Sequence, residues 1–239
     1  EIFTRWFASR GWAPRTHQLE LLRLARAGRS ALLIAPTGAG KTLAGFLPTL
    51  VELAEPHTRR APSPLEGEGW GGGSKLLPTS LIPTPNPSPQ GGGEQAELVA
   101  PANSKRRLVS TGHGVRRAGG LHTLYISPLK ALAVDIARNL ERPVAEMGLA
   151  IRLETRTGDT PVSKRQRQRR DPPDILLTTP EQLALLLASD DAPYLFGSLK
   201  RVILDELHSL VMSKRGDLLS LGLARLFTIA PQLATVGLS

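Results

Sequence analysis

The sequence predicts an α/β fold in which a mostly parallel sheet is flanked by helices and interrupted by a glycine- and proline-rich insertion. Short apolar runs rich in β-branched residues alternate with segments of helical period, which predicts the sheet and its helices. A change of composition over residues 61–120 predicts the insertion. With 239 residues, 41% of them hydrophobic, the chain is long enough for one such domain.

Six strands are expected from the apolar runs, at 31–34, 123–126, 151–154, 175–178, 201–204 and 235–238. Five helices are expected between them, at 19–27, 41–55, 129–147, 180–188 and 218–229. Thr179-Pro-Glu-Gln182 predicts a strand-to-helix turn, with Thr179 as the cap and a proline at the first helical position. Such loops follow the carboxyl ends of parallel strands, so they gather at the edge where open α/β sheets bind ligands.

The segment 61–120 holds 12 of the 23 glycines and 8 of the 20 prolines. It cannot bury enough apolar surface to offset the entropy of ordering it, so we expect a flexible low-complexity insertion inside the domain. Residues 64–70 and 85–93 resemble translated palindromic repeat elements found inserted in bacterial genes. That resemblance implies no part in the activity.

The composition narrows the function classes. The formal charge of +9, from 30 Lys and Arg against 21 Asp and Glu, favours a polyanionic partner such as nucleic acid. The absence of cysteine excludes disulfides, thiolate metal sites and a cysteine nucleophile, and it is compatible with a reducing compartment. No apolar run is long enough to span a membrane and the first residues lack the pattern of a secretion signal, so we expect a cytoplasmic location and no membrane partner.

A phosphate-binding loop follows the first predicted strand, as Ala35-Pro-Thr-Gly-Ala-Gly-Lys-Thr42. Its glycines allow backbone N–H groups to close around phosphate oxygens at the positive end of the next helix. Lys41 is expected to reach the β- and γ-phosphates of ATP, and the Thr42 hydroxyl to ligate Mg²⁺. The residues expected to cradle the nucleotide are Thr37, Gly38, Ala39, Gly40, Lys41 and Thr42.

An acidic pair ends the strand expected at 201–204, in Val202-Ile-Leu-Asp-Glu-Leu-His208. Asp205 is expected to hold the metal, directly or through water, while Glu206 orients and deprotonates the attacking water. His208 suits a residue that links this site to another part of the domain, and equally a surface histidine at the start of a helix. Gln18 lies upstream of the loop, and its side-chain amide can pair with both the donor and the acceptor edge of adenine.

These motifs, in this order, resemble a superfamily 2 DExH helicase, with Gln18 in the Gln motif, 35–42 as motif I, 127–133 as motif Ia and 205–208 as motif II. Residues 156–161, 179–183 and 213–216 are similar to the large helicase-related (Lhr) branch. Within it, residues 7–14 and the tract 121–222 resemble the bacterial ligase-associated DNA damage response helicase. The resemblance implies a RecA-like P-loop NTPase fold, ATP and Mg²⁺ as cofactors, and a role in DNA repair.

The resemblance also implies that the edge loops grip the backbone of a single or partly duplex nucleic acid, with DNA favoured. The residues expected to do so are Ser127, Lys130, Thr157, Gly158, Thr179 and Gln182. They offer hydroxyl, amide, ammonium and backbone donors that suit phosphates and ignore base identity. For each one alone, a cap or turn role is as good an interpretation. The basic run 164–170 is expected to add electrostatic attraction only.

The chain is expected to be the first RecA-like domain over 1–239, ending at 236–239 inside what would continue as motif III, with a second RecA-like domain missing. Alone it is expected to hydrolyse ATP poorly. Three alternatives stay open: an RNA helicase, a restriction-type DNA motor, or a non-catalytic nucleic-acid-binding fragment. A GTPase is disfavoured because no Asn-Lys-x-Asp or Thr-Lys-x-Asp motif occurs.

Overall fold

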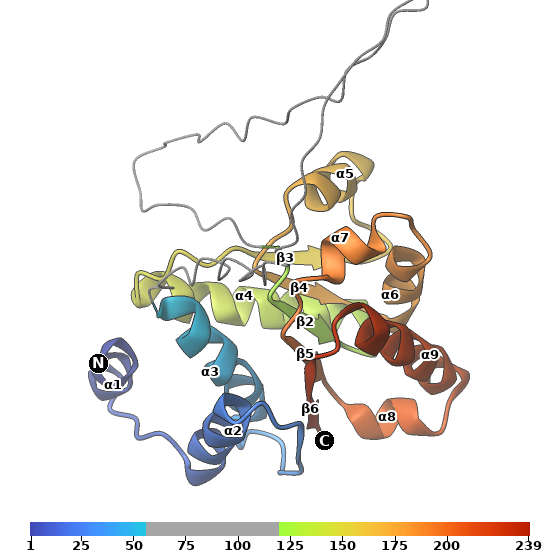
Figure 1. Ribbon diagram of the computed structural model, residues 1–239. Helices are drawn as coiled ribbons and strands as arrows, with labels where there is room; N and C mark the ends of the chain where they lie inside the picture. The colour runs from blue at the N-terminus through green and yellow to red at the C-terminus, as the bar shows by residue number, and fades with distance from the viewer. Residues whose placement is uncertain (56–119) are drawn as a thin grey trace, which may run out of the picture. The chain divides into compact units, whose positions relative to one another are not determined.

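The strands form one parallel, six-stranded sheet in the order β1-β6-β5-β2-β4-β3 (Figure 1). The structure, a computed structural model, describes residues 1–55 and 120–239, so the predicted insertion lies outside the described residues except for Gly120. The strands are β1 (Ala31–Leu33), β2 (Thr123–Ile126), β3 (Leu153–Arg156), β4 (Ile175–Thr178), β5 (Arg201–Leu204) and β6 (Ala234–Leu238). The helices are α1 (Ile2–Ser9), α2 (Thr16–Arg26), α3 (Lys41–Ala54), α4 (Lys130–Glu146), α5 (Val162–Arg170), α6 (Pro180–Leu187), α7 (Ala192–Phe196), α8 (Leu207–Val211) and α9 (Lys214–Ile229).

The predicted strands are confirmed, and β2, β4 and β5 have the predicted bounds. The prediction for β3 was wrong by two residues: the strand begins at Leu153 and continues to Arg156. The pairing with β4 begins at Leu153, and just before it the side chain of Asp174 accepts from the amide of Arg152 at 2.8 Å. At the other end, Glu154 and Arg156 are buried polar residues. Hydrophobic alternation does not reveal strand residues of this kind, because α5 supplies the partners of Glu154.

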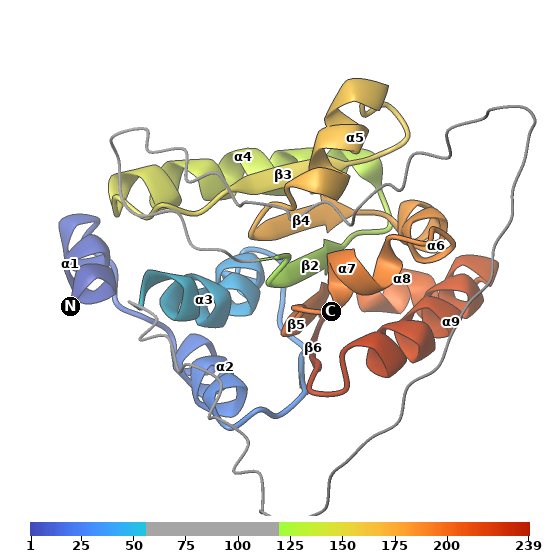
Figure 2. The same cartoon turned by 45° about the horizontal axis from the view of Figure 1, so that its top comes forward.

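Helices cover both faces of the sheet (Figures 1 and 2). Successive residues of a strand point to opposite faces, so Leu124 packs in the cluster with α6, α7 and α9, whereas Tyr125 packs in the cluster with α3 and α4. The strands β2, β4 and β5 are buried throughout, as expected of parallel strands covered on both faces. The five predicted helices are confirmed, and the structure adds α1, α5, α7 and α8.

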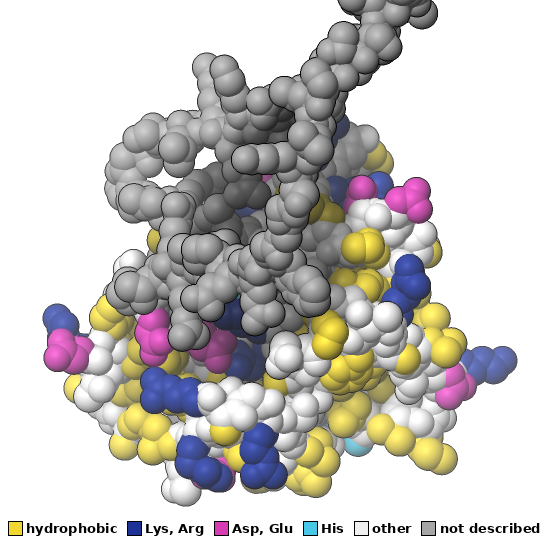
Figure 3. All heavy atoms as spheres, in the orientation of Figure 1, with side chains coloured by type: hydrophobic (Ala, Val, Ile, Leu, Met, Phe, Trp, Pro, Cys, Tyr) yellow, Lys and Arg dark blue, Asp and Glu magenta, His cyan; other side chains and the backbone are white. Residues whose placement is uncertain are grey.

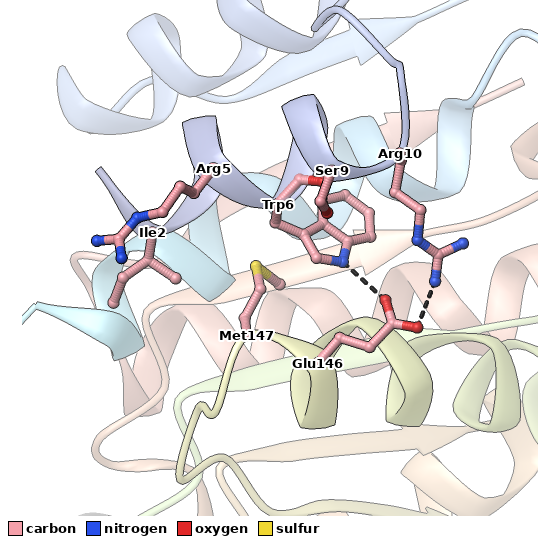
Figure 4. A pocket seen from close by; sticks show the side chains of 7 residues that line it. All are labelled: Ile2, Arg5, Trp6, Ser9, Arg10, Glu146 and Met147. Atoms are coloured by element: carbon pink, nitrogen blue, oxygen red, sulfur yellow. Dashed lines mark hydrogen bonds and ion pairs between the residues drawn. The ribbon is translucent and has the colours of Figure 1, made fainter.

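Helix α1 is bonded to the far end of α4. Figure 4 shows Trp6 and Arg10 pointing at Glu146, and Trp6 Nε1 donates to its carboxylate at 2.9 Å. Hydrogen bonds, first from Arg10 and then from Trp6, lower the pKa of Glu146 to about 2. These residues line an open cleft of about 510 Å³. A helix of 17 residues is about 25 Å long, so this cleft lies well away from the sheet edge at which α4 begins.

Charge on the described surface is mixed. Figure 3 shows basic, acidic and hydrophobic side chains interspersed where the described residues are visible. Several charges form exposed ion pairs, such as Arg23 with Glu20 at 2.7 Å. No helix within 1–55 or 120–239 combines the length and hydrophobicity needed to cross a bilayer. The overall charge therefore does not locate a binding site, and the edge of the sheet has to be considered residue by residue.

Candidate nucleotide and nucleic-acid site

The loop after β1 turns sharply into α3. Gly38 and Gly40 have φ angles of 80° and 78°, a left-handed conformation that glycine adopts without steric cost. Lys41 is the first residue of α3. Its Nζ donates to the carbonyl oxygen of Ala35 at 2.7 Å, so the ammonium group lies within the curve of the loop. Free N–H groups at the positive end of a helix, together with this ammonium group, form an anion-binding site.

Gln18 lies against this loop. Its side chain is only 3% exposed, although a glutamine on an N-terminal helix is usually on the surface. The Nε2 atom lies 3.5 Å from the carbonyl oxygen of Gly40 as donor, and Oε1 accepts from the amide of Arg15 at 2.9 Å. The structure therefore brings Gln18 and the phosphate-binding loop together. Its contact with adenine stays a prediction.

Substituting Gly40 by alanine tests the shape of this loop. A left-handed φ costs a non-glycine residue about 1–2 kcal/mol, and the new Cβ would lie 3.0 Å from Gln18 Nε2. Gly28→Ala is the matched control, because its φ of 66° imposes the same strain with no atom within 4 Å of the new Cβ. We expect both variants to lose about 1–2 kcal/mol in urea unfolding. Only Gly40→Ala should weaken binding of a fluorescent ATP analogue; equal binding by the two variants would contradict the assignment.

The acidic pair follows β5, and its two carboxylates lie in different environments. Asp205 is only 5% exposed. Its Oδ1 accepts from the amide of Glu206 at 2.9 Å, and its Oδ2 accepts from the hydroxyl of Tyr125. Burial raises the pKa of Tyr125, and the charge of Asp205 raises it further, so the phenol stays protonated and acts as the donor. Asp205 is thus a fixed carboxylate, as a metal-binding role requires.

Glu206 has the strained backbone that marks many functional positions. Its φ of 47° makes it the one non-glycine residue with positive φ among the described residues. The strained turn directs its side chain to solvent, with 38% of it exposed, 3.4 Å from His208 Nε2. The buried Asp205 and the accessible Glu206 therefore suit the separate roles expected of them.

Strand order brings the lysine loop and the acidic pair to the same edge. Strand β6 lies between β1 and β5, and all three are parallel. Ser239, directly after β6, donates to Leu33 O at 3.0 Å and accepts from Ala35 N at 3.1 Å. Its hydroxyl also lies 2.9 Å from His208 Nδ1. His208 is exposed, yet this bond connects the acidic pair to the strand beside the phosphate-binding loop.

The residues at this edge fit a nucleotide-bound magnesium ion. Among the described residues, no cluster of three His, Asp or Glu side chains could hold a metal alone. Magnesium is usually held by one or two side chains together with the substrate's phosphates and water. Asp205 suits this arrangement because its oxygens accept from neutral donors. Thr42, in the first turn of α3, supplies a hydroxyl beside Lys41.

The six residues predicted to contact a nucleic-acid strand all lie just after β2, β3 or β4, on the same edge of the sheet. Lys130 and Gly158 are exposed, whereas the other four side chains are buried: Ser127, Thr157, Thr179 and Gln182. Local bonds explain part of this burial, since Ser127 Oγ accepts from Leu129 N at 3.3 Å. Thr179 is the N-cap residue of α6, but the expected capping hydrogen bond of its side chain is absent. Direct contact of these residues with nucleic acid stays a prediction.

Sequence reasoning missed the residue that shapes the loop after β3. Arg165, in the basic run, was expected only to attract polyanions. Its guanidinium instead donates to the carbonyl oxygens of Thr160 at 2.7 Å, Gly158 at 2.5 Å and Thr157 at 3.3 Å. Lys130 Nζ reaches the same loop at Asp159 Oδ2, 2.7 Å away. The contacts span five to 29 residues along the chain, so no local pattern predicts them.

Known proteins share both sequence and fold with this chain. The DEAD/DEAH box helicase family matches residues 15–239. The Lhr helicase/probable uracil glycosylase of Mycolicibacterium smegmatis is 35% identical over 231 residues, which cover 92% of this chain and 12% of that protein. ATP-dependent helicase Lhr-Core of Methanothermobacter thermautotrophicus is 34% identical over 248 aligned residues, covering 100% of this chain and 22% of that protein.

The structure of Mycobacterium smegmatis helicase Lhr bound to ssDNA and AMP-PNP matches with a TM-score of 0.70 and 30% identity, over 100% of this chain and 24% of that one. These comparisons confirm the predicted DExH and Lhr resemblance and the RecA-like fold. The narrower resemblance to the ligase-associated helicase stays a prediction. The chain belongs to the DEAD/DEAH box helicase family.

Proposed function

We propose that this chain binds ATP-Mg²⁺ and the backbone of a single nucleic-acid strand, as the first RecA-like half of an ATP-dependent DNA helicase or translocase. The observation that carries the proposal is the shared edge of the sheet, where Lys41, the acidic pair and the loops after β2, β3 and β4 all emerge. The nucleotide and the nucleic-acid strand would thus bind to one rigid sheet. A change at the nucleotide could then reach the strand through directly packed elements.

The relatives support the choice of nucleic acid. The similar Lhr structure from Mycobacterium smegmatis is described as bound to ssDNA and AMP-PNP. At the edge of this chain, Lys130 and Arg215 are exposed cations paired with Asp159 and Glu181. Exposed pairs of this kind are weak, so a phosphate group can replace either carboxylate. Contacts with phosphates hold a strand without selecting its sequence. A role in DNA repair is proposed from the resemblance of the motifs.

A second RecA-like domain is proposed to complete the ATPase site. Large apolar side chains stay exposed next to the nucleotide edge: Ile34 after β1, and Val211 and Met212 at the end of α8. Met212 is 93% exposed. Exposed apolar groups next to a polar site are typical of a surface that another domain covers. The chain spans 12–22% of the length of the curated relatives described above, so the activity of a whole protein is part of this proposal.

The test is ATP turnover with single-stranded DNA, with single-stranded RNA of the same sequence, and without a strand. In the whole natural protein that contains this chain, we expect DNA to stimulate ATP turnover more than RNA does. The 239-residue chain is expected to bind a fluorescent ATP analogue while its turnover stays near background. Greater stimulation by RNA would favour an RNA helicase. Nucleic-acid binding without ATP turnover in the whole natural protein would indicate a non-catalytic protein.

A further inference from the structure

We propose that Tyr125 is a positioning residue of the ATPase site, and that its hydroxyl holds Asp205 in the orientation that binds the nucleotide's magnesium ion. The proposal rests on the proposed function of this edge and adds a residue that lies outside the nucleotide motifs. Tyr125 is fully buried in the central strand β2. It is one of only two tyrosines in the chain.

Tyr125 reaches Asp205 because β2 and β5 are neighbours in the sheet. The two strands are parallel, with Tyr125 opposite Ile203, and the amide of Asp205 continues the ladder to Ile126 O at 2.9 Å. This register brings the phenol to the carboxylate, where it donates to Oδ2 while the amide of Glu206 donates to Oδ1 at 2.9 Å. One neutral donor on each oxygen fixes the rotation of the carboxylate and leaves it lone pairs for further ligands.

The ring of Tyr125 makes a second contact, with the helix that carries the phosphate-binding lysine. It stacks on Phe46, with centroids 5.3 Å apart and an interplanar angle of 27°. Phe46 lies in α3, which begins at Lys41, and its side chain is fully buried. A single rigid side chain therefore touches both α3 and the acidic pair. We infer that Tyr125 sets the position of Asp205 relative to the phosphate-binding loop.

Tyr125→Phe tests the inference because it removes the hydroxyl and keeps the ring on Phe46. The chain is titrated with Mg²⁺ in the presence of a fluorescent, non-hydrolysable ATP analogue. We expect the half-saturating Mg²⁺ concentration to rise about tenfold, at the lower end of what a hydrogen bond to a charged group contributes. Binding of the analogue in EDTA should not change. A purely structural hydrogen bond would alter the urea midpoint and leave the Mg²⁺ dependence unchanged, and that result would overturn the proposal.

Tyr194→Phe is the matched control, since Tyr194 is 64% exposed and lies in α7, away from the nucleotide edge. A double-mutant cycle with Asp205→Asn supplies a second test. If Tyr125 acts through Asp205, the double variant should need no more Mg²⁺ than Asp205→Asn alone. If Tyr125→Phe unfolds, the double variant should regain stability because it removes the buried charge that has lost its hydroxyl donor; failure to regain stability would overturn the proposal.

Lys41→Ala separates failure of this inference from failure of the proposed function. Loss of analogue binding in Lys41→Ala, combined with a wild-type Mg²⁺ dependence in Tyr125→Phe, would overturn only the role of Tyr125. Full binding by Lys41→Ala would overturn the nucleotide site itself.

Discussion

Lys41→Ala is expected to weaken binding of an ATP analogue about a hundredfold, whereas Glu206→Gln should leave that binding intact and lower turnover about a thousandfold. The ammonium of Lys41 lies in the curve of the phosphate-binding loop, and losing one partner of a buried charge pair has an effect of this size. Glu206 is partly exposed at the edge. Loss of a general base typically slows a reaction by about a hundred- to ten-thousandfold.

The opposite behaviour of the two variants is what the geometry requires, because one side chain is assigned to binding and the other to chemistry. Binding is measured by fluorescence titration of the chain. Turnover is measured as phosphate released from ATP by the whole natural protein that contains the chain. Lys200→Ala is the control for charge, since it removes an exposed cation before β5, at the opposite edge of the sheet. Undiminished turnover in Glu206→Gln would show that this carboxylate does not activate the attacking water.

Arg201→Ala is expected to destabilise the fold by about 3 kcal/mol, the lower end of what breaking a buried ion pair costs, because the half-buried Glu52 loses the guanidinium and keeps only His122. Arg201 Nη2 donates to Glu52 Oε1 at 2.7 Å, and Nη1 donates to Oε2 at 3.2 Å. This pair joins the end of α3, which begins at Lys41, to the start of β5, which Asp205 directly follows. Arg23→Ala breaks an exposed pair with Glu20 and should leave the stability nearly unchanged, because water screens exposed ion pairs. Urea unfolding measures both.

The Arg201–Glu52 pair should make the stability of the fold sensitive to acid. Burial raises the pKa of Glu52, but hydrogen bonds from His122 and Arg201 outweigh burial and lower it from 4.5 to about 2. A carboxyl group with a lowered pKa stabilises the fold above its unfolded value and loses that contribution as the pH falls from about 4.5 to about 2. Glu146 titrates over the same range, so Glu52→Gln is needed to isolate the effect. Its urea midpoint should fall less than that of the wild type between pH 5 and pH 3, and equal losses would contradict the prediction.

The phosphate-binding loop shows how much of the site can be predicted locally. Its glycines, lysine and threonine are consecutive, and their backbone conformation follows from the absence of a Cβ at Gly38 and Gly40. The Asp-Glu pair is equally local, since it directly follows a buried strand. Parallel strands then place both motifs at one edge, which is why the predicted fold class is confirmed and the two motifs lie near each other.

The contacts of the other residues depend on partners that are distant in sequence. Gln18 is buried because α2 packs beside the loop, 22 residues further along the chain. The side chain of Ser127 is buried, whereas the residue type at that position suggested an accessible hydroxyl donor. Arg165 bonds three carbonyl oxygens of a loop that it was expected only to neighbour. Hydrophobic pattern and residue type carry no information about such pairings.

By itself, therefore, the sequence determined the parallel α/β fold, the strand positions apart from β3, and the identity of the phosphate-binding and acidic motifs. Each of these depends on short-range backbone preferences or on the period of apolar residues. Only the tertiary structure decided which polar side chains are buried and which donor meets Asp205. Tyr125 and Asp205 are 80 residues apart, and only the pairing of β2 with β5 brings the phenol to the carboxylate.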